Sequence, residues 1–368
     1  MSIPKKHIVL LTSEFPPLPG GIGNHALNLA EYLSESGYKV SVIADQRDTR
    51  SKEAEFDNIL KSNIYRVAKK RFRSLMYLKR IWICYKLSKK ADVLVCSGKF
   101  PLWVGAFLKS LVKAETIAVI HGTEVNFSNP RLRTSVDNSL RRYYKVIAVS
   151  NYTKSLVDHL LLKNIRVIPN GFSISKGDSK LSEALVLSGS PKLLTVGNVT
   201  ERKGQAEVIK HLPKVLEQYP NAHYHCIGFK TEADQCLALA KSLNVSKHIT
   251  FHGHVSHSEL VNFYSVSDIS VMLSQTTKTG DVEGFGIALI EANYFGLPTI
   301  GSKGCGIEDA ISDGKSGLLI NASHTTEFIN AMDRILDNRD EFEAESKLWA
   351  ERHQWKNIIQ RYIDYIEL

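Results

Sequence analysis

Short apolar runs alternate with longer amphipathic segments along the whole chain. Residues 8–12, 39–44 and 114–120 have the length and composition of buried strands, and residues 24–36 repeat apolar positions at helical spacing. Three more strand-like runs follow in the first half, at 92–96, 145–149 and 165–168. The alternation predicts an α/β fold with a doubly wound parallel sheet.

The same alternation restarts in the second half, after a segment with little periodicity. That segment, residues 173–190, is rich in Ser, Gly and Lys and is interpreted as an interdomain connector. We therefore expect one domain over 1–172, a second over 191–350, and a final amphipathic helix within 351–368. The predicted strands of the second domain are 192–196, 224–227, 248–252, 269–273 and 298–302, with helices at 204–218, 232–243, 256–266 and 287–295.

The composition is that of an ordinary globular protein. Of 368 residues, 43% are hydrophobic and 23% charged, which excludes a disordered chain. The five cysteines are scattered and show no C-x-x-C spacing, so neither a zinc site nor a disulfide framework is indicated and a reducing cytoplasm is expected. No apolar run approaches the ~20 residues needed to span a bilayer.

The net charge of +9 is unevenly distributed. Residues 66–90 contain ten Lys or Arg and no acid, interleaved with apolar and aromatic residues such as Tyr77 and Trp82. Three interpretations are open at this point: a helix lying on an anionic membrane, a helix packed on the sheet with a solvated basic back, or a nucleic-acid site.

Two carboxylates, Glu283 and Glu291, flank a Gly-Phe-Gly turn and an apolar run. On an ideal helix eight residues span roughly 12 Å, whereas a glycosidase pair needs about 5–10 Å. The spacing instead suits the two ends of one extended ligand, with the N-terminus of the helix at 287–295 directed at an anion between them. A nucleotide-sugar has that shape; two unrelated surface glutamates are the structural alternative.

Three more loops follow predicted strands. Gly20, Gly21 and Gly23 place bare backbone N–H groups at a helix start, although their spacing is not that of the dinucleotide fingerprint. His121 follows the strand 114–120, where it could donate to a sugar hydroxyl or stabilise charge.

Arg202 and Lys203 follow the strand 192–196 and could neutralise a pyrophosphate leaving group. A solvated pair of charges is the alternative, but positive charge near a helix N-terminus is unfavourable without an anion.

The run Glu-Gly-Phe-Gly-x-x-x-x-Glu-Ala at 283–292, followed by Gly-x-Pro, resembles the signature of the retaining glycosyltransferases of family 4. That family has the GT-B fold, in which two Rossmann-like domains face each other across a cleft. The likeness extends over most of the chain in the family's order. It includes Gly20-Gly21-Ile-Gly23-x-His25, His121-Gly122-Thr123-Glu124, Val149-Ser150-Asn151, Ile168-Pro169-Asn170-Gly171 and Val196-Gly197 with Arg202-Lys203-Gly204.

The resemblance implies a role for each matching residue. Glu283 would hold the transferred sugar and, with His121, belong to the catalytic group, while Glu124 would lie on the acceptor side. Asn198 stands where the family commonly has an arginine. The donor-binding residues implied are Gly21, Gly23, Arg202, Lys203, His254, Val255, Phe285, Gly286, Ile287 and Glu291.

The resemblance also implies the partners. The substrates would be a nucleotide-sugar donor and a glycan or lipid-linked acceptor, and neither a metal nor another cofactor would be required. Because lipid-linked acceptors are common in the family, it favours membrane contact for residues 66–90 over nucleic acid, and hence a cytoplasmic protein at the inner face of the membrane. The alternatives are a GT-B nucleotide-sugar epimerase and a non-catalytic nucleotide- or polyanion-binding module.

Overall fold

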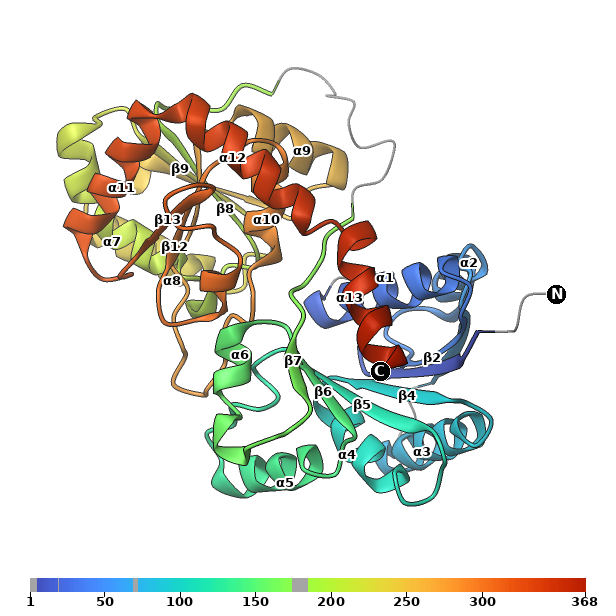
Figure 1. Cartoon of the computed structure of the whole chain (residues 1–368). Helices are drawn as coiled ribbons and strands as arrows, with labels where there is room; N and C mark the ends of the chain where they lie inside the picture. Colours follow the sequence, from blue (N-terminus) through green and yellow to red (C-terminus); the bar gives the residue numbers. More distant parts are fainter. Residues whose placement is uncertain (1–4, 19, 69–71, 174–184) are drawn as a thin grey trace. The chain divides into compact units, whose positions relative to one another are not determined.

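The computed structural model describes residues 5–18, 20–68, 72–173 and 185–368 and divides the chain into two compact units (Figure 1). The first unit comprises Met1–Gly171 together with Trp355–Leu368, and the second comprises Phe172–Gln354. Each unit is built around one parallel sheet with helices packed on it. Of the predicted connector 173–190, residues 174–184 lie outside the described residues.

The first sheet has seven strands in the order β3-β2-β1-β4-β5-β6-β7. Its central strands are almost wholly buried because helices cover both faces, which explains their continuous apolar sequences. β1 pairs in register with both neighbours, so that Ile8 lies beside Val40 and Val93. The strands are β1 (His7–Thr12), β2 (Lys39–Asp45), β3 (Asn63–Val67), β4 (Val93–Ser97), β5 (Glu115–Ile120), β6 (Lys145–Ala148) and β7 (Ile165–Val167).

The helices of this unit lie on two faces of the sheet, since right-handed crossovers in opposite directions place them on opposite sides. One face carries α1 (Gly21–Glu35) and α2 (Arg50–Asn58); the other carries α3 (Arg73–Ser88), α4 (Lys99–Leu108) and α5 (Pro130–Leu140), as Figure 1 shows. Two short helices, α6 (Asn151–Ser155) and η1 (Asp158–Leu160), precede β7.

The last helix, α13 (Trp355–Glu367), packs on α1. The hydroxyl of Tyr362 lies 2.8 Å from Nε2 of the buried His25, and Glu367 pairs with Lys6 at 2.8 Å. Arg361 donates to the carbonyl of Val167 at 2.9 Å. The end of the chain is thereby fixed to the unit that contains its beginning.

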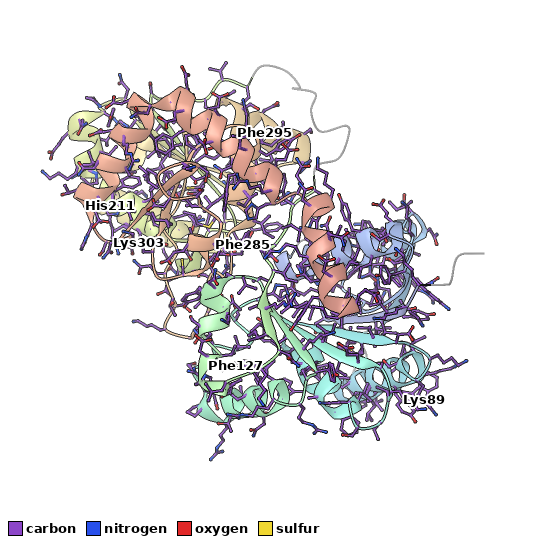
Figure 2. All side chains as sticks on the ribbon, viewed as in Figure 1. Lys89, Phe127, His211, Phe285, Phe295 and Lys303 are labelled. Carbon is purple, nitrogen blue, oxygen red and sulfur yellow. The ribbon has the colours of Figure 1, made fainter. Side chains whose placement is uncertain are left out.

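The basic stretch 66–90 is not one helix. Arg66 lies in β3 and binds both carboxylate oxygens of Asp57, whereas Arg80 is buried and paired with Asp45. Residues 69–71 lie outside the described residues. The other five cations are exposed on or just beyond α3, where Lys89 is labelled in Figure 2: Arg73, Lys79, Lys86, Lys89 and Lys90.

The second unit has a six-stranded sheet in the order β10-β9-β8-β11-β12-β13. Its strands are β8 (Lys192–Val196), β9 (His223–Ile227), β10 (Ile249–Gly253), β11 (Ile269–Met272), β12 (Thr299–Ser302) and β13 (Gly317–Ile320). Its helices are α7 (Gln205–Gln218), α8 (Ala233–Ser242), α9 (His257–Val266), α10 (Ile287–Tyr294), α11 (Thr325–Asp337) and α12 (Arg339–Arg352), with single 3-10 turns η2 (Glu201–Lys203), η3 (Ser246–His248) and η4 (Gly306–Asp309).

Candidate functional site

Each sheet reverses its strand order at one point, and ligands of such sheets bind outside the carboxyl ends of the strands there. In the first unit the reversal lies between β1 and β4, and in the second between β8 and β11. The predicted residues Arg202 and Lys203 follow β8, and Glu283 follows β11. The sequence candidates of the second unit therefore meet at its reversal point.

The loop after β8 is pressed against the end of β11. Gly204 has a φ of +77°, and a Cβ atom built on it would lie 1.9 Å from the carbonyl oxygen of Leu273. Only glycine fits at such an approach. The hydroxyl of Ser274 donates to the carbonyl of Arg202, which fixes the loop further. This packing delivers Arg202 and Lys203 to the loop that carries Glu283.

Arg202 and Lys203 converge on the carboxylate of Glu283. Nζ of Lys203 lies 2.7 Å from Oε2 of Glu283, and Nη1 of Arg202 pairs with the same oxygen. Nε of Arg202 also lies 3.3 Å from Asp281. Burial alone would raise the pKa of Glu283, but the charges of Lys203 and Arg202 and the backbone N–H of Phe285 lower it to about 2. The group is a compact cluster of two cations and two carboxylates.

The turn that holds Glu283 is supported from the η4 loop. Gly306 donates its N–H to the carbonyl of Glu283 at 2.9 Å, and a Cβ at Gly306 would lie 2.1 Å from the carbonyl oxygen of Gly284. The side chain of Phe285, labelled in Figure 2, is only 2% exposed and anchors the turn in the core.

Helix α10 begins directly after this turn at Ile287. Gly286, with a φ of +95°, is its N-cap residue, and no side chain caps the first backbone N–H groups. Uncapped N–H groups at a helix start favour an anion.

Glu291 lies on α10 and differs from Glu283 in its electrostatics. Burial raises the pKa of Glu291, although the hydroxyl of Tyr264 lies 3.2 Å from Oε2 and partly offsets this. Only Glu291 is helical, since Glu283 lies in the preceding turn. The helix predicted over 287–295 is confirmed as α10, and the roughly 12 Å of an ideal helix does not apply to this pair because Glu283 precedes the Gly-Phe-Gly turn.

His254 and Val255, two of the expected donor-binding residues, follow β10. His254 is exposed and stacks on Phe229 with ring centroids 5.0 Å apart, and Val255 packs beside a small apolar cluster. The N–H of Phe229 donates to the side chain of Asn198 at 3.4 Å. Asn198, where the family commonly has arginine, thus holds the backbone of Phe229, the residue on which His254 stacks.

In the first unit, the candidates meet beside β4. His121 follows β5, and its Nε2 lies 2.9 Å from the hydroxyl of Ser97 at the end of β4. The ring of His25 on α1 stands edge-on to that of His121, with centroids 4.9 Å apart. Burial lowers the pKa of His121 to about 4, so its imidazole is neutral at pH 7.

Glu124, expected on the acceptor side, is fully buried. Its Oε1 accepts the backbone N–H of His121, and burial raises the pKa of its carboxyl to about 7 despite that hydrogen bond. The side chain lies beneath the loop that carries His121, so we assign it to positioning this loop rather than to contact with an acceptor.

Two of the three glycines of the first loop, Gly21 and Gly23, serve different purposes. A Cβ at Gly23 would lie 3.2 Å from backbone atoms of Glu14 and Phe15, whereas one at Gly21 would meet nothing within 4 Å. Gly23 lets α1 pack closely on the loop, and Gly21 leaves the backbone at the helix start open.

Several contributing residues were not among the sequence candidates: Ser97, Tyr264, Ser274, Asp281 and Tyr362. Ser97 and Ser274 directly end or follow strands at the reversal points, and this position could have identified them. Tyr264 and Tyr362 contribute through tertiary contacts that leave no local signal.

Within the described residues, no group of three or more His, Cys, Asp or Glu is arranged to hold a metal ion. None of the helices in the described ranges is both long and apolar enough to cross a membrane.

Comparison with known proteins gives matches over both halves of the chain. Residues 19–176 match the model described as Glycosyltransferase Family 4, and residues 179–358 match that described as Glycosyl transferases group 1. The chain is 26% identical to an uncharacterized glycosyltransferase of Methanocaldococcus jannaschii over 98% of each chain. It is 24% identical to a GDP-mannose-dependent alpha-(1-6)-phosphatidylinositol monomannoside mannosyltransferase of Mycobacterium tuberculosis, covering 98% of this chain and 97% of that one.

Among solved structures, the chain resembles HepE of Anabaena, crystallised with UDP and glucose. The TM-score is 0.77 at 18% identity, covering 98% of this chain and 99% of that one. At this identity the likeness concerns the fold, which is GT-B.

Proposed function

The chain belongs to the family 4 glycosyltransferases and is a glycosyltransferase of GT-B fold, and on that premise we propose its reaction. It transfers a sugar from a nucleoside-diphosphate donor, with retention at the anomeric carbon, to a glycan or lipid-linked acceptor in the synthesis of cell-surface polysaccharide or glycolipid. The observation that carries this proposal is the cluster of Arg202, Lys203 and Glu283 beside the uncapped start of α10.

The cations of this cluster are suited to a diphosphate. A diphosphate placed at the start of α10 would meet backbone N–H groups, Lys203 and Arg202, which supply the guanidinium and ammonium donors that phosphate oxygens bind most strongly. We assign to Arg202 the charge that the family usually provides at the position of Asn198. Because these groups can carry the charge, the reaction as proposed needs no metal.

The two glutamates have separate roles in this scheme. Glu283 stays ionised over the whole physiological pH range and would hold the transferred sugar, stabilising positive charge that develops at its ring. Glu291, on the helix behind it, would bind the ribose hydroxyls. Gly286 and Ile287 would contribute backbone N–H groups to the diphosphate, whereas Phe285, whose N–H binds Glu283, would hold the turn in place. His254 and Val255 would contact the base.

The bond changes need no dedicated side-chain base. The acceptor hydroxyl attacks the anomeric carbon as the bond to the diphosphate breaks, and the departing phosphate takes the acceptor proton. On the acceptor side, neutral His121 would donate to a sugar hydroxyl, and the open backbone at Gly21, with Gly23, would meet donor phosphate and acceptor.

The names of the relatives select the first donors to test. GDP-mannose and UDP-glucose, with GDP and UDP, should be screened by thermal shift, because a ligand of the folded state raises the melting temperature. The bound donor is then incubated with candidate acceptors, and the anomeric configuration of the product is determined by NMR. Isomerised donor without acceptor would indicate an epimerase, and binding without turnover of any donor would indicate a non-catalytic module; inverted product would refute retention.

The outer surface of α3 supports contact with an anionic membrane at the cytoplasmic face. Leu75, Leu78 and Trp82 are 48%, 62% and 58% exposed and follow one another at helical spacing among the exposed lysines. Each Lys or Arg near such a surface contributes about 1 kcal/mol. Changing Lys79, Lys86, Lys89 and Lys90 to Gln should abolish co-sedimentation with acidic vesicles at low salt and leave donor binding unchanged. A wild-type protein that stays in the supernatant would exclude this contact.

A further inference from the structure

Helices α4 and α5 lie side by side, with α5 on the side of α4 away from α3 (Figure 1). A groove of about 450 Å³ is lined by residues of α4, of α5 and of the turn after α5. Helix α4 contributes Trp103 and Phe107, which are one turn apart. The groove follows the outer surface of the helix layer rather than the carboxyl edge of the sheet, so it is distinct from the candidate sites described above. We propose that it is a second binding site, for an anionic glycan segment.

The residues that line the groove provide the two kinds of group that bind sugars, an aromatic ring and neutral hydrogen-bonding side chains. Phe107 is 55% exposed and presents an apolar ring, which can pack on the apolar face of a sugar ring. Thr134, Ser135 and Asn138 line the opposite side and provide hydroxyl and amide groups for sugar hydroxyls. Aromatic surface beside neutral hydrogen-bonding groups is a combination that a simple polyanion site does not need.

The ends of the groove are marked by two arginines. Arg131 and Arg142 both line it and are eleven residues apart on and just beyond α5, which corresponds to roughly 16 Å along a helix. Among the described residues neither guanidinium has a carboxylate partner, and Nη2 of Arg142 donates only to the neutral hydroxyl of Ser110 at 2.9 Å. Guanidinium groups bind carboxylate, phosphate and sulfate oxygens in a bidentate manner. Because Arg131 and Arg142 are far apart along the groove, a ligand that binds both must be extended and must carry acidic groups at intervals.

The surrounding charge favours the same ligand. Residues 99–114 and 130–144 contain seven Lys or Arg and one acid, Asp137. Asp137 is buried, and its Oδ2 lies 2.9 Å from Nε2 of His159, so it does not offset the cations at the surface. The groove also begins near Arg131, shortly after the loop of His121 and Glu124. A long acidic acceptor could therefore lie along the groove behind its reacting end.

Binding can be measured without donor or turnover, so the result is independent of the proposed function. The probe is a six-residue oligogalacturonate, titrated calorimetrically at 50 mM salt, with neutral maltohexaose and inorganic phosphate as comparisons. Arg131→Gln/Arg142→Gln should weaken oligogalacturonate binding more than tenfold. The matched variant Lys113→Gln/Arg133→Gln removes the same charge at positions that do not line the groove. It should change the affinity for oligogalacturonate less than twofold.

Phe107→Ser tests the apolar contact, because it changes no charge and alters an exposed side chain. It should lower affinity for oligogalacturonate at least threefold while leaving the melting temperature unchanged. Three outcomes would overturn the proposal. The first is no binding of oligogalacturonate by the wild-type protein, and the second is equal losses of oligogalacturonate affinity in the two double variants. The third is that Arg131→Gln/Arg142→Gln loses binding to acidic vesicles but keeps its binding to oligogalacturonate. The second would indicate diffuse electrostatic attraction, and the third a lipid surface.

Discussion

Replacing Glu283 with Gln removes the carboxylate that Arg202 and Lys203 share. Folding lowers the pKa of Glu283 from 4.5 to about 2. At 1.36 kcal/mol per unit this corresponds to about 3 kcal/mol of stabilisation of the folded state. Because the side chain of Glu283 is 11% exposed, little of this is lost to solvent screening.

The pH dependence of the effect follows from the direction of the shift. A carboxyl whose pKa is lowered by folding contributes its full stabilisation above the unfolded value of 4.5, and loses it as the pH falls through about 2. The free energy of unfolding of Glu283→Gln should therefore lie about 3 kcal/mol below that of the wild type at pH 7, and the difference should fall to roughly half near pH 3. Urea unfolding followed by circular dichroism between pH 3 and 7 measures it.

Asp281→Asn provides the matched control, since it removes the same charge from the same cluster. Asp281 is 42% exposed and its contact with Arg202 is longer, so we expect a loss of at most about 1 kcal/mol. Binding gives a second test: with Glu283 neutral, the cations are free for a diphosphate, so GDP or UDP should bind Glu283→Gln at least as tightly as wild type while turnover falls. A pH-independent stability difference, or a parallel loss of nucleotide affinity, would refute this account of the cluster.

Three further predictions concern single side chains. Lys203→Ala should weaken binding of the nucleoside diphosphate tenfold or more and that of the free nucleoside hardly at all in calorimetric titration, because a charge-assisted contact contributes roughly 1.5–3 kcal/mol. The pKa of the buried Glu124 carboxyl is raised to about 7, so its ionisation destabilises the folded wild-type protein as the pH rises from 4.5 to 7. The free energy of unfolding of Glu124→Gln, measured in urea, should therefore rise relative to that of the wild type by up to about 3 kcal/mol over this range. Gly204→Ala should lose at least about 3 kcal/mol in the same assay, whereas Gly21→Ala should change by less than about 1 kcal/mol.

Each of these has an outcome that contradicts it. Equal losses for nucleoside and nucleoside diphosphate would show that Lys203 acts through the structure of its loop. A constant difference between Glu124→Gln and wild type from pH 4.5 to 7.5 would mean that the carboxyl is not held in an apolar environment. Wild-type stability of Gly204→Ala would show that the loop after β8 can move away from β11.

Much of the fold follows from the apolar runs, because strands buried on both faces carry a strong signal. β3 was not predicted, since Asn63–Val67 is an edge strand with partly exposed positions and reads as polar. Helix α1 begins at Gly21 instead of 24, because the glycines that mark the loop also form the first helical turn.

The candidate site was predictable in its parts but not in its assembly. Arg202 and Glu283 are 81 residues apart, and only the order of β8 and β11 in the sheet brings them together. The same limit applies to the basic stretch, where the count of charges could not show that Arg66 and Arg80 are neutralised by Asp57 and Asp45. Local composition records which groups are available, whereas tertiary pairing decides which of them are free.

The return of α13 to the first unit makes the second unit an insertion within the first. The chain crosses between the units twice, at Gly171–Phe172 and at Gln354–Trp355. The two ends of the second unit are hydrogen-bonded to each other, since the N–H of Phe172 donates to the carbonyl of His353 at 3.0 Å. A chimera with a related enzyme should therefore exchange 172–354 as one cassette, since a cut at the first crossing alone would separate Trp355 and Tyr362 from the helix that they cover.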